Sequence, residues 1–430
     1  MKNAYWFIAA GVALLIAFYA PSPYMAFSIY AFLLLVTLSH ISSVAWLSGL
    51  DCERTVTPDT LQQGEEVAVE VTITNRRGWP IPWIYFEDVT PPGFKRHGDT
   101  TRLTILMPGR SVKLKYRLTC PRRGYHRIGP LVMESGDLFG LQKRFRTGKR
   151  QDYVSVLPTV AYIDTFNIAA RRPQGPVRVS NKIYEDPTRI SGVREYQPGD
   201  PLNRIHWKVS ARTGDLFCKL NEPSSVQGGT LVLDLHKLSY GDDEKAESRM
   251  ELAITTTASI AYLLQMSGEQ LGMITNGRDA AEIARYEVAS KQTLSRDDAA
   301  ASVVGEGTSD RLSPLSVPTR RSPVQALQIV ENLARIVPTD GLGIIDLLMS
   351  EFRRLPRDAA LLPVVPRVTD KLALALAGLK LSGFAVSVFY INDARGYPEA
   401  AGRLAPHQIH VFHIEQEWSL HEISPARIGH

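Results

Sequence analysis

The spacing of hydrophobic and polar positions changes twice along this 430-residue chain, and each change predicts a different kind of structure. Residues 4–20 and 24–47 form two apolar runs, with a Pro-Ser-Pro turn at 21–23 between them. A helix needs roughly 17–25 apolar residues to cross a bilayer, and proline ends a helix. The pattern therefore predicts a transmembrane helical hairpin over residues 1–50.

The flanks of the two apolar runs indicate how this hairpin lies in the membrane. Aromatic side chains of the kind found at bilayer surfaces stand near the run ends, at Tyr5, Trp6, Tyr19, Tyr24 and Trp46. Lys2 and the basic residues after position 75 place both ends in the cytoplasm. We expect a multi-pass protein of the bacterial inner (cytoplasmic) membrane, with its soluble domains facing the cytoplasm.

Two other interpretations of the apolar region are weaker. A cleaved signal peptide needs small residues before its cleavage site, whereas Phe18 stands there. A hairpin in the core of a soluble protein is disfavoured because residues 3–50 contain no Asp, Glu, Lys or Arg.

Residues 51–160 change to a period of two. Apolar and polar residues alternate over 67–75 and 112–118, and Pro108-Gly109 gives a turn signal. No long helical period interrupts the region. Short strands at this spacing predict an all-β immunoglobulin-like sandwich.

Residues 227–430 combine apolar strands with helical periods. We expect strands at 230–235, 271–274, 361–365, 384–389 and 409–414, and helices at 245–266, 322–337, 340–352 and 369–380. This alternation predicts an α/β domain with a doubly wound, mostly parallel sheet. Residues 288–322 are rich in Ser, Asp and Gly, and we expect a mobile insertion there.

The connector between these two domains, residues 161–226, contains the densest set of chemically active side chains. Its signature segment, residues 192–212, brings together Arg194, Glu195, Tyr196, Asp200, Arg204, His206, Trp207, Lys208, Ser210 and Arg212. Residues 198–201 form a strong Pro-Gly-Asp-Pro turn signal. We expect short strands at 205–208 and 216–219.

The signature segment closely resembles that of the domain-of-unknown-function 58 family. Residues 135–141 also resemble a recurrent stretch of that family, which we interpret as a turn that buries Leu138 and Phe139. The resemblance implies a membrane-anchored protein with a von Willebrand factor A-like domain and a MoxR-type AAA ATPase as its partner. It implies no biochemical activity.

Three hypotheses apply to the signature segment. His206 could act as a base oriented by Asp200 or Glu195, although no Gly-x-Ser-x-Gly motif accompanies Ser210, and Cys218 lies in an apolar stretch. Alternatively, its arginines could pair with carboxylates and Trp207 could supply buried area, which would hold domains together.

The third hypothesis is a docking surface, because tryptophan, tyrosine and arginine dominate the binding energy of many interfaces. We assign no catalytic residue. The candidate interaction or domain-docking residues are Arg194, Tyr196, Asp200, Arg204, His206, Trp207, Lys208, Ser210 and Arg212.

The resemblance to von Willebrand factor A domains also implies a metal site at the carboxyl ends of the strands. The first metal loop of such domains reads Asp-x-Ser-x-Ser, whereas residues 234–238 here read Asp-Leu-His-Lys-Leu. The second loop corresponds to residues 341–343, and Asp370 fits a helix start better than the third loop. Because hard cations need several oxygen ligands, we predict no bound metal, with Asp234 as a remnant, and no cofactor.

The charge distribution and the cysteine content limit which ligands and covalent links the chain could have. Residues 110–150 contain twelve Lys and Arg against two Asp and Glu, within a chain of net charge +5. This region could bind anionic lipid headgroups or nucleic acid, or form a solvated sheet face, and the lack of interleaved aromatics disfavours nucleic acid. Three separated cysteines without a CxxC pair argue against disulfides or a zinc site.

The preferred interpretation is a membrane-anchored scaffold or adaptor that is not an enzyme and has no small-molecule substrate. Its expected partners are the lipid membrane and the ATPase, in complex assembly or envelope maintenance. The alternatives are a hydrolase-type enzyme using His206 with Asp200, and a lipid or nucleic-acid binder acting through residues 110–150.

Overall fold

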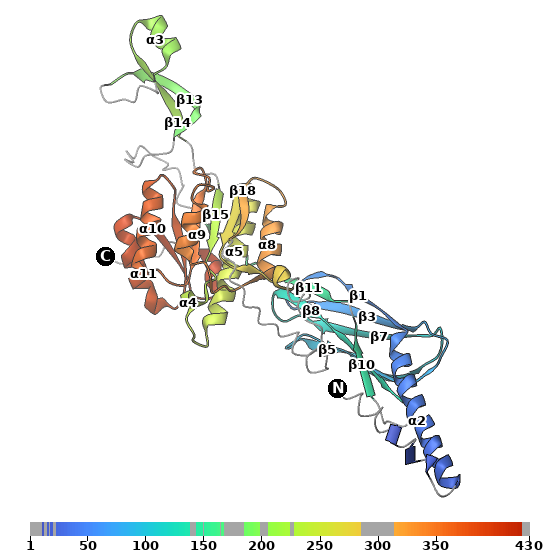
Figure 1. Cartoon of the computed structure of the whole chain (residues 1–430). Helices are drawn as coiled ribbons and strands as arrows, with labels where there is room; N and C mark the ends of the chain where they lie inside the picture. Colours follow the sequence, from blue (N-terminus) through green and yellow to red (C-terminus); the bar gives the residue numbers. More distant parts are fainter. Residues whose placement is uncertain are drawn as a thin grey trace. The chain divides into compact units, whose positions relative to one another are not determined.

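The chain divides into two compact units. The computed structural model describes residues 11–12, 15–16, 18–19, 23–137, 143–148, 150–163, 165–166, 185–197, 205–223, 228–284 and 314–423 (Figure 1). One unit comprises residues 1–157 with 284–308, and the other comprises residues 158–283 with 309–430. The boundaries predicted at residues 50, 160 and 226 stay predictions.

The first unit consists of one long helix followed by strands. Its elements are α2 (Pro23–Ser48), β1 (Leu50–Thr57), β2 (Thr60–Gln62), β3 (Glu66–Asn75), β4 (Ile81–Asp88), β5 (Lys95–His97), β6 (Thr101–Leu106), β7 (Ser111–Thr119), β8 (Gly124–Ile128), β9 (Leu131–Gly136), β10 (Lys143–Thr147) and β11 (Asp152–Leu157). The absence of a helical period over residues 52–160 thus correctly predicted a β-structure.

Two four-stranded sheets, β1-β3-β7-β5 and β10-β9-β4-β6, and the three-stranded sheet β2-β11-β8 make up this β-structure. The two four-stranded sheets are antiparallel throughout. On β3 the apolar residues of the alternating pattern, from Val67 to Ile73, are all buried. Successive side chains of a strand point to opposite faces, so this alternation places one face of the sheet on the core.

A buried ion network ties four of these strands together. The Arg54 guanidinium on β1 forms an ion pair with Asp88 at the end of β4, and its Nη1 lies 3.1 Å from the Asp152 carboxylate on β11. The Tyr116 hydroxyl on β7 donates a 2.6 Å hydrogen bond to Asp88. Burial, with the nearby Asp88 charge, raises the pKa of Tyr116 well above its usual range, so the hydroxyl stays a donor.

Helix α2 has 26 residues and, in the part of the chain that the structure describes, is the one helix long and apolar enough to cross a bilayer. Its last turn enters the β-structure, where Leu47 and Leu50 are buried in the core. The other predicted span, residues 4–20, lies largely outside the described residues, so the two-span hairpin stays a prediction.

The second unit contains a short strand β12 (Thr165–Phe166), the signature hairpin and an α/β domain. The domain strands are β15 (Gly228–Leu233), β16 (Gln270–Thr275), β17 (Arg278–Asp279), β18 (Leu315–Arg320), β19 (Ile336–Val337), β20 (Ala360–Val365), β21 (Ser387–Ile391), β22 (His410–Ile414) and β23 (Glu422–Ile423). Its helices are α4 (Lys237–Tyr240), α5 (Ala246–Met266), α8 (Gln325–Arg335), α9 (Ile344–Glu351), α10 (Asp370–Leu381) and α11 (Tyr397–Leu404), with single 3₁₀ turns at Ala394–Gly396, Ala405–His407 and Glu417–Leu420.

The main sheet has the strand order β18-β16-β15-β20-β21-β22. All neighbours are parallel except β18, which pairs antiparallel with β16 at the edge. From β15 the chain adds strands on one side of the sheet, and from β20 it adds them on the other. Open α/β sheets bind ligands at the carboxyl ends of the strands around such a reversal. All six residues of β15 are buried, as a strand covered on both faces requires.

Most predicted elements of this domain are confirmed, but one prediction within it and one in the connector are wrong. Residues 315–320 form strand β18 rather than part of a mobile insertion, because their backbone pairs with β16 and Val317 is buried. Residues 288–313 of that insertion lie outside the described part of the chain. Residues 205–208 form no strand, since a helix begins at Trp207 and only Ile205 makes a β-bridge, to Cys218.

Candidate functional site

The signature segment is a two-stranded hairpin that carries a short helix. Strand β13 (Glu185–Glu195) pairs antiparallel with β14 (Phe217–Pro223), with Arg194 opposite Cys218. Helix α3 (Trp207–Thr213) lies between the strands in sequence, and Figure 1 shows it next to the end of the hairpin. The hairpin therefore presents α3 on a β-ribbon.

One end of α3 is fixed by the signature residue His206 and the other by Gly214, just after the signature segment. The His206 Nδ1 accepts a 3.3 Å hydrogen bond from the Val209 amide, so His206 caps the amino end. At the other end Gly214 adopts a left-handed conformation with φ +86°, which glycine tolerates. The buried Ser210 hydroxyl accepts a 2.9 Å hydrogen bond from the Phe217 amide and joins α3 to β14.

The outer side of α3 exposes an aromatic ring and two cations. Trp207 is 67% exposed, and Lys208 and Arg212 are exposed as well. Lys208 and Arg212 are four residues apart, so their side chains neighbour each other on the helix surface, and Lys208 follows Trp207 in the sequence. The prediction that Trp207 supplies buried area is wrong, because the capped helix turns this side chain outward.

The other candidate residues lie away from this exposed face or outside the described residues. Arg194 and Tyr196 are half-buried on and just after β13, and the Arg194 guanidinium donates a 3.2 Å hydrogen bond to the Glu195 carbonyl. Asp200 and Arg204 lie outside the described residues. The pairing of His206 with Asp200 therefore stays a prediction.

The nucleophiles and bases considered from the sequence are engaged in structural contacts. His206 Nδ1 and the Ser210 hydroxyl both accept hydrogen bonds from backbone amides, and Cys218 is buried. Burial raises the pKa of the Cys52 and Cys120 thiols to about 11, which disfavours the reactive thiolate. These contacts favour an architectural role for the side chains.

Asp234 lies at the carboxyl end of β15, where the metal loop was considered. Its Oδ1 accepts hydrogen bonds from the His236 amide at 3.0 Å and from the Asn276 side chain at 2.8 Å. Asn276 follows β16 and also accepts a 2.7 Å hydrogen bond from the Leu235 amide. The buried carboxylate thus organises the loops after β15 and β16.

The other residues considered for this metal site have local partners too. His236 caps α4 by accepting from the Leu238 amide. Asp370 begins α10, as predicted, and forms a 2.7 Å ion pair with Arg403. Within the described ranges, no three His, Cys, Asp or Glu side chains are grouped to hold a metal ion.

The basic region at 110–150 is partly neutralised by the neighbouring strand. Lys113 and Lys115 on β7 lie 2.7 and 3.1 Å from Glu70 on β3, and Arg117 lies 3.8 Å from Glu66. Hydrogen bonds from Lys113 and Lys115 lower the pKa of Glu70. This arrangement fits the solvated cationic sheet face better than a free anion-binding patch.

Comparison with known proteins places the signature hairpin in a family region. Residues 192–296 match the family described as "Protein of unknown function DUF58". Over 258 residues the chain is 26% identical to the uncharacterized protein YeaD of Bacillus subtilis (strain 168), covering 59% of this chain and 62% of that protein. The chain thus contains a DUF58 region and is a distant relative of YeaD.

Solved structures resemble smaller parts of the chain. The CARDB domain of a Pyrococcus furiosus protein is 18% identical with a TM-score of 0.18, covering 25% of this chain and 91% of that one. A FixG-related protein from Vibrio parahaemolyticus is 8% identical with a TM-score of 0.18, covering 25% and 97%. At these TM-scores the likeness carries no conclusion about fold or function.

Proposed function

We propose that this chain is a membrane-anchored adaptor that docks a protein partner on the outer face of α3. The observation that carries the proposal is the 67% exposure of Trp207 on a helix whose ends are fixed by His206 and Gly214. A large apolar side chain on a preorganised helix loses little conformational entropy when it is buried by a partner. Trp207 is therefore the expected centre of the interface.

The charges beside Trp207 define the chemistry of the partner. Lys208 and Arg212 are exposed on the same helix, and among the described residues neither forms an ion pair with an acidic side chain. Tryptophan and arginine are enriched among residues that dominate binding energy. The partner surface should combine an apolar pocket for the indole with acidic side chains at its rim.

The remaining architecture, in this proposal, anchors the chain in the membrane. We propose that residues 4–20 and α2 form a two-span hairpin, with both ends in the cytoplasm at the bacterial inner membrane. The two antiparallel four-stranded sheets support an immunoglobulin-like sandwich. The order β18-β16-β15-β20-β21-β22, with an antiparallel edge strand, supports a von Willebrand factor A-like domain.

The partner that we propose is a MoxR-type AAA ATPase, acting with this chain in complex assembly or envelope maintenance. This choice rests on the family resemblance of the signature segment. Helix α3 lies within the residues that match DUF58, so the resemblance includes the proposed docking surface.

Charge reversal on α3 tests the proposal. The full-length protein in detergent is passed over an immobilised MoxR-type ATPase from the same bacterium, and the retained fraction is measured. The double variant Lys208→Glu with Arg212→Glu should lose retention at least tenfold. Lys371→Glu with Arg395→Glu, two exposed cations of the α/β domain, is the charge-matched control and should bind like wild type. Equal retention of both variants would overturn the proposal.

A further inference from the structure

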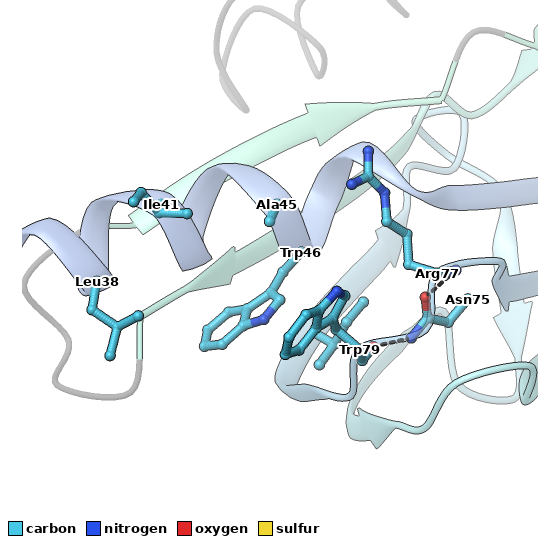
Figure 2. Close-up of a pocket in the computed structure, with 8 residues that line it drawn as sticks. Leu38, Ile41, Ala45, Trp46, Asn75, Arg77 and Trp79 are labelled. Atoms are coloured by element: carbon cyan, nitrogen blue, oxygen red, sulfur yellow. Dashed lines mark hydrogen bonds between the residues drawn. The ribbon is translucent and has the colours of Figure 1, made fainter.

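A pocket lies where α2 meets the β-structure of the first unit. It has a volume of about 300 Å³. Its lining comes from the last turns of α2 and from the β3–β4 segment (Figure 2), namely Leu38, Ile41, Ala45, Trp46, Asn75, Arg77, Trp79 and Ile81. Neither the signature hairpin nor the proposed docking function involves this pocket.

The helix wall of the pocket is an apolar stripe of the candidate membrane span. Leu38, Ile41 and Ala45 follow at spacings of three and four residues, which places them on one face of α2. From Leu38 to Trp46 the helix rises by about 12 Å, at about 1.5 Å per residue. Leu38 and Ile41 are exposed, so this wall is open to an apolar occupant of that length.

The facing wall is held in place by a buried asparagine. Asn75, at the end of β3, is only 1% exposed. Its Nδ2 donates a 2.8 Å hydrogen bond to the Trp79 carbonyl, and its Oδ1 accepts a 3.0 Å hydrogen bond from the Arg77 amide. The turn that carries Arg77 and Trp79 is therefore shaped by the protein before any ligand arrives.

Two indoles from different elements lie along the pocket. Trp46 comes from α2 and packs against the core, whereas Trp79 comes from the β3–β4 turn and is 72% exposed (Figure 2). Tryptophan prefers the bilayer surface, where its ring lies at the level of the lipid headgroups. Both rings accordingly mark the headgroup level next to the apolar stripe.

The cation at the pocket is Arg77. Its neighbour Arg76 forms an ion pair with Asp51, but no acidic side chain pairs with Arg77 within the described ranges. The carbonyl groups at the carboxyl end of a helix attract cations, so the end of α2 could hold a cation of its own. On α2 that role belongs to Arg146, which donates to the carbonyls of Leu47 at 2.8 Å and Leu50 at 3.3 Å. Arg77 is thus available for an external anion.

We propose that this pocket binds one anionic phospholipid of the leaflet beside the sandwich. One acyl chain lies along Leu38, Ile41 and Ala45, and the phosphate lies against the Arg77 guanidinium at the carboxyl end of α2 (Figure 2). The proposal rests on the membrane crossing by α2 and is independent of the α3 docking surface. A soluble anion would leave the apolar wall uncovered, whereas a lipid covers the wall and meets the charge.

Native mass spectrometry of the full-length protein tests this site. The protein is reconstituted into vesicles of equal parts phosphatidylglycerol and phosphatidylcholine, extracted into mild detergent, and its bound lipids are counted. Wild type should retain one phosphatidylglycerol in preference to phosphatidylcholine. Arg77→Gln should lower retained phosphatidylglycerol about fivefold, which corresponds to roughly 1 kcal/mol for one well-placed cation. Trp79→Ala should lower the retention of both lipids.

Arg96→Gln is the matched control, because Arg96 is an exposed cation of the same sandwich. Arg96 pairs with Leu118 on β7, whereas Thr74, the residue before Asn75, pairs with Ser111 on the same strand. Leu118 and Ser111 are about 24 Å apart along β7, at about 3.4 Å per residue, so the control lies far from the pocket. Equal phosphatidylglycerol retention by the Arg77 and Arg96 variants, with equal melting temperatures, would overturn the lipid site. A wild-type protein that does not enter vesicles would overturn the site and the anchor together.

Discussion

Arg146 on β10 donates a 2.8 Å hydrogen bond to the carbonyl oxygen of Leu47 in the last turn of α2. The final carbonyls of a helix have no partner within the helix, so this guanidinium supplies one. Leu47 itself is buried in the core of the β-structure. The candidate membrane helix and the β-structure are therefore joined without a flexible linker.

Replacing Arg146 should loosen this junction. Arg146→Met keeps the aliphatic stem but removes the charged donor, and a hydrogen bond to a charged group contributes about 1.5–3 kcal/mol. We expect the melting temperature of the detergent-solubilised protein to fall by several degrees. Lys143→Met on the same strand removes an exposed 3.6 Å pair with Glu134 and should cost less than about 1 kcal/mol. Equal losses would contradict this account of the junction.

The Arg54–Asp88 pair should contribute far more than a surface pair. Asp88→Asn leaves the buried Arg54 charge without its main partner, and breaking a buried pair costs about 3–5 kcal/mol. Asp51→Asn breaks a solvent-exposed pair with Arg76 and should cost less than about 1 kcal/mol. Denaturant unfolding of both variants gives the comparison. A similar cost for the two substitutions would show that Asp88 is not a structural anchor.

His206 should act as a helix cap rather than as a base. Loss of a cap costs about 0.5–2 kcal/mol, and asparagine is among the best capping residues. His206→Ala should therefore speed hydrogen exchange of the Val209 amide and weaken partner binding, and His206→Asn should restore both. If His206→Asn were as defective in binding as His206→Ala, the imidazole would have a role beyond capping.

Asp234 should stabilise its loops without a metal ion. Asp234→Ala leaves the His236 amide without its acceptor and the Asn276 side chain with only the Leu342 carbonyl, which costs about 1–3 kcal/mol. We expect millimolar Mg²⁺ to leave the melting temperature of wild type unchanged, because that carboxylate oxygen already accepts two hydrogen bonds. A Mg²⁺-dependent rise in wild type that disappears in Asp234→Ala would instead reveal a metal site.

The sequence predicted those elements whose patterns are long and regular. The alternation around Val69 predicted β3, and the helical period from Leu327 to Val337 predicted α8. Strand β18 escaped prediction because Leu315 and Val317 stand beside a long polar stretch. Its strand conformation depends on pairing with β16, where Gly272 leaves room for the backbone at Thr319.

The sequence predicted which segment carries the candidate site, but it did not predict the geometry of that segment. Ile205, Trp207 and Val209 alternate with polar residues and so favour a strand, yet the capping side chain of His206 starts a helix. Histidine is not among the usual capping residues, so the sequence gives no such signal. The pocket could not be predicted from the sequence, because Trp79 is a single aromatic residue in a polar turn and only the fold brings it to Trp46.

The affinity of the full-length protein for the MoxR-type ATPase tests the central claim most directly. Trp207→Ala is compared with Trp418→Ala, which removes an indole of equal exposure, 68% against 67%, from the α/β domain. Truncating a residue at the centre of an interface costs about 2 kcal/mol or more. The docking account predicts that Trp207→Ala weakens binding roughly thirtyfold and that Trp418→Ala binds like wild type. Undiminished binding of Trp207→Ala, with the fold intact, would contradict it.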